Sequence, residues 1–470
     1  MKTVLAFDFG ASSGRAIRAT FDGKEIRYEE IHRFENIPKE VDGHVCHDVD
    51  MIFGEIKVAI EKAGKVDSIA FDTWGVDYAL LDKEGDILHE PFHYRDERTK
   101  DALKKAFSKM SADQIYAETG NQIMNINTLF QLISDDNLEK ADKLLFMPDL
   151  FAYLLTGEKV CEISIASTSQ MLDLKNGVWS KKVLDAFGIR ESLFPELKQS
   201  ATVNGEYKGI PVISVAGHDT QCAVAAMPAK GENAAFLSCG TWSLLGCELD
   251  GPVMTEKSNA LELSNEMGAN GKINFLKNIS GLWLIQETRR DLAKNGRKYS
   301  YNELEMLARE SEPFRSFVDP DAPELSAHGS LPDKIRKYCK KTGQAVPETT
   351  GQLVRCIYES LAMKYRLALE QISECTGKKF DVLHLMGGGT KDGFLCELTS
   401  QSLGIPVIAG PVEATALGNI VLQLIALGEI ESIEEGRRII AETERVVTFN
   451  KEHTPDWDNA YMRFCKAISK

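Results

Sequence analysis

The chain has 470 residues, with 55 Lys and Arg against 70 Asp and Glu, and a formal net charge of -15 at pH 7. This length exceeds one ordinary hydrophobic core, so we expect two domains. The negative charge argues against nucleic acid or an anionic membrane surface as a partner, and no apolar stretch approaches the roughly 20 residues of a membrane span. Ten scattered cysteines without a C-x-x-C pair indicate reduced thiols and a cytoplasmic protein.

Residues 3–21 predict a strand, a tight turn and a second strand. An apolar run ends in the small-residue turn 10–14, and strand-like spacing resumes at Arg15. Asp8 lies inside the apolar run, where burying its charge costs several kcal/mol unless a partner compensates. A divalent cation is a common partner of such a carboxylate, and the N–H groups of a Gly- and Ser-rich turn can surround an anion. We therefore expect a site for Mg²⁺ and phosphates, with an ordinary glycine-rich hairpin as the alternative.

The following elements alternate between strands and helices. The apolar spacing predicts a helix over 51–62, and residues 68–82 are typical of two strands with a break between them. Residues 97–155 are mostly helical in pattern, with Asp149 as a candidate N-cap. A buried strand over 210–216 completes the first half. This alternation is typical of an α/β domain.

A polar tetrapeptide, residues 217–220, follows that buried strand and opens a helix over 219–226. Ligands of open α/β sheets bind at the carboxyl ends of the strands, so we expect these side chains to belong to a site. The helix dipole should lower the pKa of Asp219 in the first turn and keep it ionised, ready to accept a proton from a hydroxyl group. The alternative is a plain N-cap Asp beside a packed His218.

The second half repeats the hairpin. Residues 234–246 again predict strand, small-residue turn and strand, but Ser238 stands where the first hairpin has Asp8. A metal ligand is therefore expected in the first half only. Two such hairpins indicate two related domains that face one nucleotide. The turn-rich link between the hairpins gives the domains 1–230 and 231–470.

A third glycine-rich element comes late in the chain. A buried strand over 380–386 leads into the three glycines 387–389 and a helical run over 392–403. Strand, glycines and helix in this order present backbone donors to a phosphate or an adenosine. A tight turn is the alternative for this element taken alone. Helical spacing also covers 281–295 and 351–375.

Together these motifs resemble the FGGY carbohydrate kinases. The segments that carry the resemblance are 8–15, 72–77, 217–220, 238–243 and the triple glycine, which stand in the expected order over approximately residues 1–430. Residues 10–15, 278–286 and 410–415 look specific to the branch that phosphorylates L-rhamnulose. The resemblance implies an α/β fold of two actin-like, ribonuclease-H-like ATPase domains with the active site in the cleft between them.

The resemblance also implies an ATP-dependent sugar kinase that uses Mg²⁺ and binds a small sugar. No coiled-coil or interface signature stands out in the sequence, so we expect a monomer, although the oligomeric state stays open. Asp219 would be the general base that takes a proton from the primary hydroxyl of the sugar, and Asp8 would hold Mg²⁺. The positions that match the sugar side of the family are Gly75, His218, Asp219, Thr220 and Asn278. The positions that match the nucleotide side are Ala11, Ser12, Ser13, Gly14 and Arg15 around the phosphates, with Thr241, Gln286 and Gly388.

Several alternatives stay open. One is a kinase of another ketose or polyol, such as L-fuculose, D-xylulose or glycerol, because specificity depends on a few pocket side chains. Another is a non-catalytic actin-like ATPase that senses a sugar; such a protein needs no base, and Asp219 argues against it. Trp74 either stacks on an apolar sugar face or belongs to the core. Lys391 and Asp392 stand where a Gln-Asn pair is common, which leaves the adenine-side contacts open.

Overall fold

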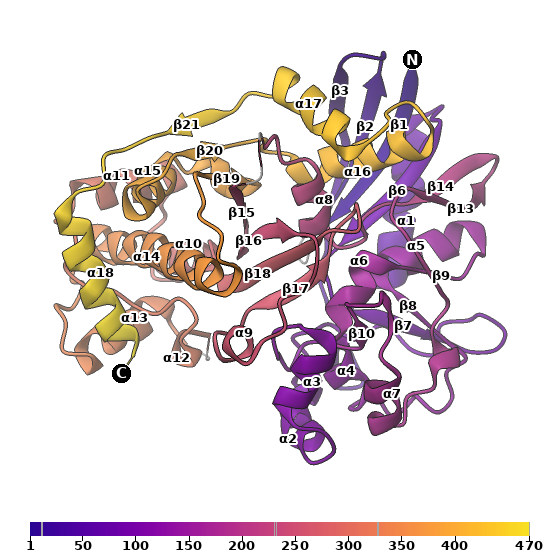
Figure 1. The fold of residues 1–470 in the computed structure, drawn as a ribbon, viewed down its shortest axis with the longest axis horizontal. Helices are drawn as coiled ribbons and strands as arrows, with labels where there is room; N and C mark the ends of the chain where they lie inside the picture. The colour runs from indigo at the N-terminus through magenta and orange to yellow at the C-terminus, as the bar shows by residue number, and fades with distance from the viewer. Residues whose placement is uncertain (11–12, 230, 232, 327–328, 470) are drawn as a thin grey trace. The chain divides into compact units, whose positions relative to one another are not determined.

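The computed structural model describes residues 1–10, 13–229, 231, 233–326 and 329–469 (Figure 1). By its contacts the chain divides into two compact units, each assembled from three segments. Unit 1 contains Met1–Pro228, Glu248–Phe275 and Ala414–Glu444, and unit 2 contains Ala229–Cys247, Leu276–Glu413 and Arg445–Lys470. The assignment of sugar binding to residues 1–230 and of nucleotide binding to 231–470 stays a prediction.

A six-stranded sheet runs through unit 1. Its strands, in spatial order, are β13 (Thr202–Tyr207), β14 (Ile210–Ser214), β6 (Ser68–Thr73), β1 (Lys2–Phe9), β2 (Ser13–Phe21) and β3 (Ile26–Glu35). The hairpin β1–β2 is antiparallel, whereas β6 runs parallel to both β1 and β14. The predicted strand, turn and strand over 3–21 are confirmed, but the second strand begins at Ser13 rather than at Arg15. Gly14 therefore lies within β2 and not in the turn.

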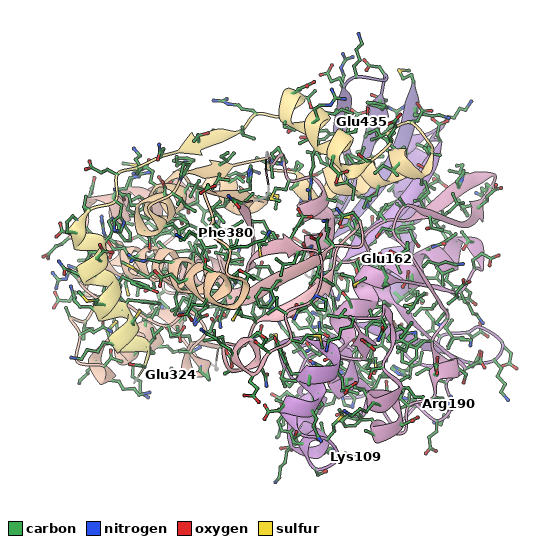
Figure 2. The ribbon with its side chains drawn as sticks, viewed as in Figure 1. Lys109, Glu162, Arg190, Glu324, Phe380 and Glu435 are labelled. Atoms are coloured by element: carbon green, nitrogen blue, oxygen red, sulfur yellow. The ribbon has the colours of Figure 1, made fainter. Side chains whose placement is uncertain are left out.

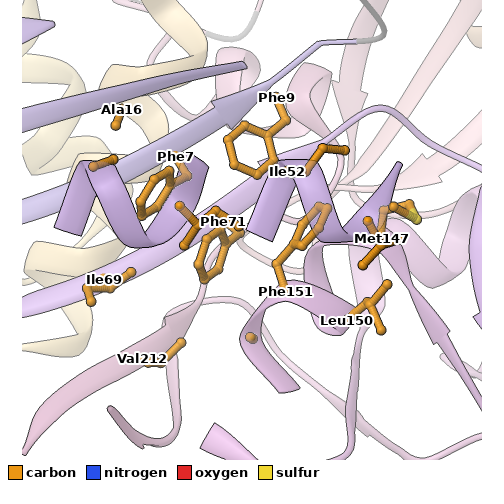
Figure 3. Packing of buried hydrophobic residues seen from close by; sticks show 14 of the residues in the cluster. Phe7, Phe9, Ala16, Ile52, Ile69, Phe71, Met147, Leu150, Phe151 and Val212 are labelled. Carbon is orange, nitrogen blue, oxygen red and sulfur yellow. The ribbon is translucent and has the colours of Figure 1, made fainter. Parts of the chain in front are cut away.

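Aromatic side chains from β1 and β6 form the core of unit 1 with α1 and α5. The Phe7 and Phe71 rings stack with centroids 4.9 Å apart, and the Phe9 and Phe151 rings meet edge to face at 5.3 Å (Figure 3). Ile52 of α1 is buried in the same cluster. The helices of unit 1 are α1 (Val49–Ala63), α2 (Ala102–Phe107), α3 (Ala112–Thr119), α4 (Thr128–Leu132), α5 (Met147–Thr156), α6 (Ile163–Ala166), α7 (Lys181–Phe187), α8 (Asp219–Ala225), α9 (Glu256–Ala260), α16 (Ala414–Ala426) and α17 (Ile433–Thr443).

The predicted helical stretch over 97–155 is interrupted. Short helices are followed by strand β8 (Lys143–Phe146), which pairs with β7 (Tyr78–Leu81). Asp149 is not the N-cap of α5, because Phe146 holds that position and the Asp149 carboxylate accepts the backbone N–H of Glu162. The other two-stranded pairs are β4 (Lys39–Val41) with β5 (His44–Cys46), β9 (Val160–Glu162) with β12 (Glu196–Lys198), and β10 (Leu172–Asp173) with β11 (Val178–Trp179).

Unit 2 repeats the local plan of unit 1. The hairpin β15–β16 is antiparallel, and β19 runs parallel to β15, as β6 does to β1. The strands of this seven-stranded sheet, in spatial order, are β17 (Ser264–Met267), β18 (Ile273–Ser280), β16 (Trp242–Leu249), β15 (Ala234–Cys239), β19 (Val382–Met386), β20 (Val407–Ala409) and β21 (Val447–Phe449). By its contacts β17 belongs to unit 1. The two predicted glycine-rich hairpins are thus both confirmed as β-hairpins, each followed in its sheet by a parallel strand.

The helices of unit 2 include the three predicted from the late sequence pattern. They are α10 (Trp283–Lys294), α14 (Thr350–Thr376) and α15 (Gly393–Leu403). The remaining helices are α11 (Tyr301–Glu310), α12 (Pro323–Ser326), α13 (Leu331–Lys341) and α18 (Pro455–Ile468). All ten cysteines of the chain are free. In the part of the chain that the structure describes, no helix is long and apolar enough to cross a membrane.

Helix α16 lies against β1, β6 and α8 within unit 1 (Figure 1). Gly418 permits this close packing. A Cβ atom at Gly418 would stand 1.8 Å from the carbonyl oxygen of Cys222 in α8, so only hydrogen fits there. The position of α16 therefore depends on a glycine whose backbone conformation is ordinary for a helix.

We expect Gly418→Ala to lower the stability of the protein and Gly54→Ala to raise it. The new methyl group at residue 418 forces α16 away from α8, and such overpacking typically costs about 1–3 kcal/mol. Gly54 is exposed within α1 with nothing near its added Cβ, so alanine should favour the helix by roughly 0.5–1 kcal/mol. Urea unfolding of both variants measures the effect. Midpoints that move in the same direction would contradict this account of α16.

Candidate active site

Two carboxylates stand side by side at the ends of strands β1 and β6. Asp8 and Asp72 are direct partners in the parallel register. Asp8 is 8% exposed, and its carboxylate accepts a hydrogen bond from the guanidinium of Arg15, its partner on β2. The charge compensation that burial of Asp8 demands is therefore supplied by Arg15 in this structure. Arg15, predicted to bind phosphates, lies beside the predicted metal ligand.

Asp72 is the more deeply buried member of this pair. Its side chain is fully buried, and Oδ2 accepts a 2.7 Å hydrogen bond from Nδ2 of Asn419. Oδ1 of Asp72 makes no hydrogen bond to any residue that the structure describes. Burial, and next the nearby Asp8 carboxylate, hold the pKa of Asp72 well above its usual value. Asp72 therefore favours the protonated form far more than an exposed aspartate does.

The polar face of α16 was missed by sequence reasoning. Asn419 also approaches the carbonyl oxygen of Phe7, at 3.4 Å, and Gln423 donates to that of Leu5, at 3.2 Å. Gln423 further accepts the Ser68 hydroxyl at 2.7 Å. The available signal was a pair of amides spaced i, i+4 in an otherwise apolar helix, which places both on one face. Through them α16 binds the backbone and carboxylate of the strands that carry the site.

The predicted loop 217–220 lies beside the end of β6. The Thr73 N–H donates to the carbonyl oxygen of Gly217 at 2.8 Å. A Cβ atom at Gly217 would stand 2.9 Å from the Pro148 side chain, so this close approach requires glycine. Gly75 follows two residues after Thr73, and a Cβ there would press on the Thr168 side chain. Gly75 thus lies two residues after the strand end that the loop contacts, and both belong to unit 1.

Asp219 is the first residue of α8, after the N-cap His218. Its side chain is 33% exposed, and Oδ1 lies 3.5 Å from Nε2 of His218 and 3.3 Å from the Thr220 hydroxyl. The prediction that the helix dipole lowers its pKa is wrong. Burial raises the pKa of Asp219, and the Asp8 carboxylate adds to this rise, although the His218 imidazole opposes it. Loss of hydration outweighs the dipole of a seven-residue helix.

Glu162 binds the backbone at the start of loop 217–220, and nothing in the sequence pattern marked it as a site residue. It is buried and is labelled in Figure 2. Its Oε2 accepts the backbone N–H groups of Ser164, Ile165 and Gly217 at 2.9, 3.0 and 2.9 Å. Oε1 accepts the Ser200 hydroxyl at 2.6 Å. One carboxylate thereby caps α6 and fixes the backbone that precedes His218.

A hydrogen bond to Asp77 holds Trp74 in the core of unit 1. The Trp74 side chain is 6% exposed, and its Nε1–H donates to Asp77 at 2.9 Å. Asp77 also accepts from His47, at 2.7 Å, and from Gln131, at 2.9 Å. Burial alone would raise the pKa of Asp77, but the His47 imidazole and these hydrogen bonds bring it below its usual value. Of the two sequence interpretations of Trp74, the structure supports the core residue.

The predicted nucleotide-side residues of the second half gather in unit 2. The carbonyl oxygen of Thr241, in the β15–β16 turn, accepts the N–H of Trp283 at 3.2 Å, at the start of the helix that carries Gln286. Gly388 follows β19, the parallel neighbour of β15, and a Cβ there would meet open space. Asn278, predicted on the sugar side, lies on β18 in unit 2.

The remaining predicted residues have mixed outcomes. Ala11 and Ser12 lie outside the described residues. Ser13 begins β2, and its carbonyl oxygen accepts the N–H of Gly10 at 2.9 Å. A Cβ on Gly14 would overlap the Phe34 ring, so packing explains this glycine. Asp392, one of the two unusual residues after the triple glycine, caps α15 by accepting the N–H of Leu395.

The donor chemistry at the end of β1 fits the Mg²⁺ ion that the sequence implies. Asp8 supplies a carboxylate, and the partnerless Oδ1 of Asp72 lies at the same register position of the neighbouring strand. Mg²⁺ is usually bound by one or two carboxylates together with water and substrate phosphates. Within the described ranges, no three His, Cys, Asp or Glu side chains form a ready-made metal site.

Family sequence models match both halves of the chain. The N-terminal domain of the FGGY family of carbohydrate kinases matches residues 3–227, and its C-terminal domain matches residues 235–427. The chain belongs to the FGGY family of carbohydrate kinases. It is therefore an ATP-dependent sugar kinase. A protein named rhamnulokinase from Bacteroides thetaiotaomicron is 42% identical over 483 residues and covers 99% of both chains. Another of that name from Ligilactobacillus salivarius is 38% identical and covers 97% of this chain and 96% of its own.

Solved structures share the fold at low sequence identity. A xylulose kinase from Lactobacillus acidophilus has a TM-score of 0.81 at 16% identity and covers 99% of this chain and 97% of its own. A glycerol kinase from Plasmodium falciparum has a TM-score of 0.78 at 17% identity, with the same coverage. The predicted α/β fold of two actin-like ATPase domains is confirmed.

Two Asp→Asn substitutions five residues apart should change stability in opposite directions. In Asp72→Asn the oxygen that Asn419 binds is kept and the partnerless oxygen becomes an amide, so an unfavourable charge is lost. In Asp77→Asn the new NH₂ faces the groups that now donate to the carboxylate, and a buried polar group left without a partner typically costs about 1–3 kcal/mol. We expect a higher melting temperature for the first variant and a lower one for the second at pH 7.5.

The pH dependence of the two variants separates them further. Because the pKa of Asp72 is raised on folding, wild-type stability should increase as the pH falls through that pKa. Asp72→Asn should remove this increase. Because the pKa of Asp77 is lowered on folding, its contribution is present at neutral pH and disappears only as the pH falls through that lowered pKa. Melting curves from pH 2 to 8 measure both effects, and equal shifts at every pH would contradict the assignment.

Proposed function

We propose that this chain phosphorylates L-rhamnulose on O1, with ATP as the phosphate donor. The observation that carries the proposal is the group of curated relatives named rhamnulokinase, which are 35–42% identical over nearly the whole chain. Residues 278–286 and 410–415, expected for that branch of the family, support the same substrate. The ten free thiols support a reducing compartment, and we propose the cytoplasm.

Asp219 is the proposed general base. It is partly exposed beside His218 and Thr220, whereas Asp72 is fully buried. A base is most effective when its pKa lies near the working pH, and burial moves the pKa of Asp219 in that direction. In the proposed step the O1–H bond breaks and its proton passes to the Asp219 carboxylate. A bond forms from O1 to the γ-phosphorus as the bond from that phosphorus to the leaving ADP oxygen breaks.

The remaining site residues bind and orient the substrates. Gly75, His218, Thr220 and Asn278 are assigned to the sugar, and Ala11–Arg15, Thr241, Gln286 and Gly388 to the nucleotide. Asp8 would hold Mg²⁺, directly or through water. When bound, Mg²⁺ neutralises charge on the phosphates. Arg15 is placed to change partner between Asp8 and a phosphate oxygen, since its guanidinium can bind either anion.

The substrate assignment is tested with a panel of acceptors in a coupled assay of ADP release. We expect the highest kcat/KM for L-rhamnulose, ahead of L-fuculose, D-xylulose and glycerol. A site built to bind a hydroxyl or methyl group loses about 1–3 kcal/mol with each missing contact, which is roughly 10- to 200-fold. Phosphorus–proton coupling in the product should locate the new ester on O1. A higher kcat/KM for L-fuculose or D-xylulose would contradict the substrate but not the kinase class.

Asp219→Asn tests the base. The substitution keeps the size of a partly exposed side chain at the first position of α8, so folding should survive. It removes proton acceptance, and we expect kcat to fall by about two to four orders of magnitude with a much smaller change in KM for the sugar. Asp8→Asn is the comparison variant, expected instead to raise the Mg²⁺ concentration needed for half-maximal activity. More than about a tenth of wild-type kcat in Asp219→Asn, a difference of only ~1.4 kcal/mol, would contradict the proposal.

A further inference from the structure

A carboxylate from a different segment of the chain contacts the histidine next to the proposed base. Glu266, on β17, is 5% exposed and belongs to unit 1. Its Oε2 lies 2.9 Å from Nδ1 of His218. The other ring nitrogen, Nε2, lies 3.5 Å from Oδ1 of Asp219. The imidazole thus stands between two carboxylates, one deeply buried and one partly exposed.

The contacts around Glu266 define the direction of each hydrogen bond. The Gln221 side-chain amide donates to the same Oε2 at 2.6 Å, and Gln221 in turn accepts from the Asn274 side chain. The Gln221 amide nitrogen also lies 3.4 Å from Nδ1 of His218. We assign a proton to Nδ1, which then donates over the shorter distance of 2.9 Å to an accepting Glu266 carboxylate. Gln221 lies one helical turn after His218, the N-cap of α8, so both side chains reach Glu266 from one face of the helix.

The charge of the ring follows from its neighbours. A neutral ring with its proton on Nδ1 would turn the Nε2 lone pair toward the Asp219 carboxylate, whereas an imidazolium turns an N–H toward it. Burial lowers the pKa of His218, but the groups that face the ring, Glu266 from β17, Asp219 from α8 and Glu162 from β9, are all acidic. Their combined effect holds the pKa of His218 above its usual value. The geometry and the charges both favour the imidazolium.

We propose that Glu266 is a positioning residue for catalysis, which holds His218 as an imidazolium with its Nε2–H directed at Asp219. The proposal rests on Asp219 as the base of the proposed function. In this arrangement Glu266 fixes the plane and the charge of the ring, and the ring fixes the Asp219 carboxylate. The imidazolium also keeps Asp219 ionised against the opposing effects of burial and of Asp8. Asp219 is thereby kept able to accept the proton of the sugar hydroxyl.

Glu266→Gln tests the proposal with the full chain and its best sugar. The amide keeps the shape and one acceptor oxygen but removes the charge, so His218 should lose its proton at lower pH. We expect kcat to fall about 10- to 100-fold, by analogy with the loss of a carboxylate that orients a metal-binding histidine. The alkaline limb of the pH profile should move to lower pH. Profiles of kcat that differ in height but not in the position of this limb would overturn the proposal.

Two further variants separate a positioning role from a structural one. Asp135→Asn is the matched control, because Asp135 is a buried carboxylate that faces His89 at 3.4 Å and accepts the Tyr78 hydroxyl. It should lower the melting temperature without moving the alkaline limb. His218→Asn keeps a donor toward Glu266 without a titratable ring. Adding Glu266→Gln to His218→Asn should have little further effect on kcat, whereas a full, additive loss would overturn the proposal.

The wild-type protein supplies a readout that does not depend on activity. With ¹⁵N-labelled histidine, the ring signals of His218 are identified among nine histidines by their loss in His218→Asn. We expect both ring nitrogens to be protonated below a titration midpoint that lies above the ordinary histidine value of about 6.5. A neutral ring protonated on Nε2 would overturn the proposal. Full activity of Asp219→Asn would instead refute the proposed base, whatever the state of this ring, so the two failures are distinguishable.

Discussion

Burial of negative charge at one edge of the unit 1 sheet is the constraint on which the site depends. Asp8, Asp72 and Asp219 lie at the ends of β1 and β6 and at the start of α8, close enough that the Asp8 carboxylate raises the pKa of the other two. Each buried carboxylate costs several kcal/mol if left uncompensated. A different residue compensates each carboxylate. The Arg15 guanidinium pairs with Asp8, the Asn419 amide donates to Asp72, and the His218 imidazole lies beside Asp219.

Because their partners differ, these three chemically similar side chains suit different proposed roles. Asp8 is paired with a cation and is the member of the group suited to exchange that partner for a metal ion. Asp72 has one amide donor and a raised pKa, which suits a neutral carboxyl group. Asp219 retains partial exposure and a nearby imidazole that opposes the rise in its pKa, which suits the proposed base. Environment rather than residue type therefore distinguishes the proposed base from its two neighbours.

The features predicted correctly from the sequence depend on residues close together in the chain. Both glycine-rich hairpins, the strand before loop 217–220 and the late helices follow from local patterns of apolar spacing and small residues. The errors have tertiary causes. Gly14 serves the Phe34 ring, and Asp149 is buried rather than capping a helix. The direction of the Asp219 pKa was wrong because burial is a property of the folded chain, whereas a helix dipole can be anticipated from position alone.

The partners that sequence reasoning missed come from segments that return to unit 1 late in the chain. Asn419 and Glu266 both lie in the range matched by the C-terminal family model, yet both belong to unit 1 by their contacts. They bind Asp72 and His218, which lie in the range of the N-terminal model. Without these segments the Asp72 side chain would lose the hydrogen bond from Asn419. His218 would lose its contact with the buried Glu266 carboxylate. The boundary between the family domains is thus a boundary in sequence, and the electrostatics of the site are completed across it.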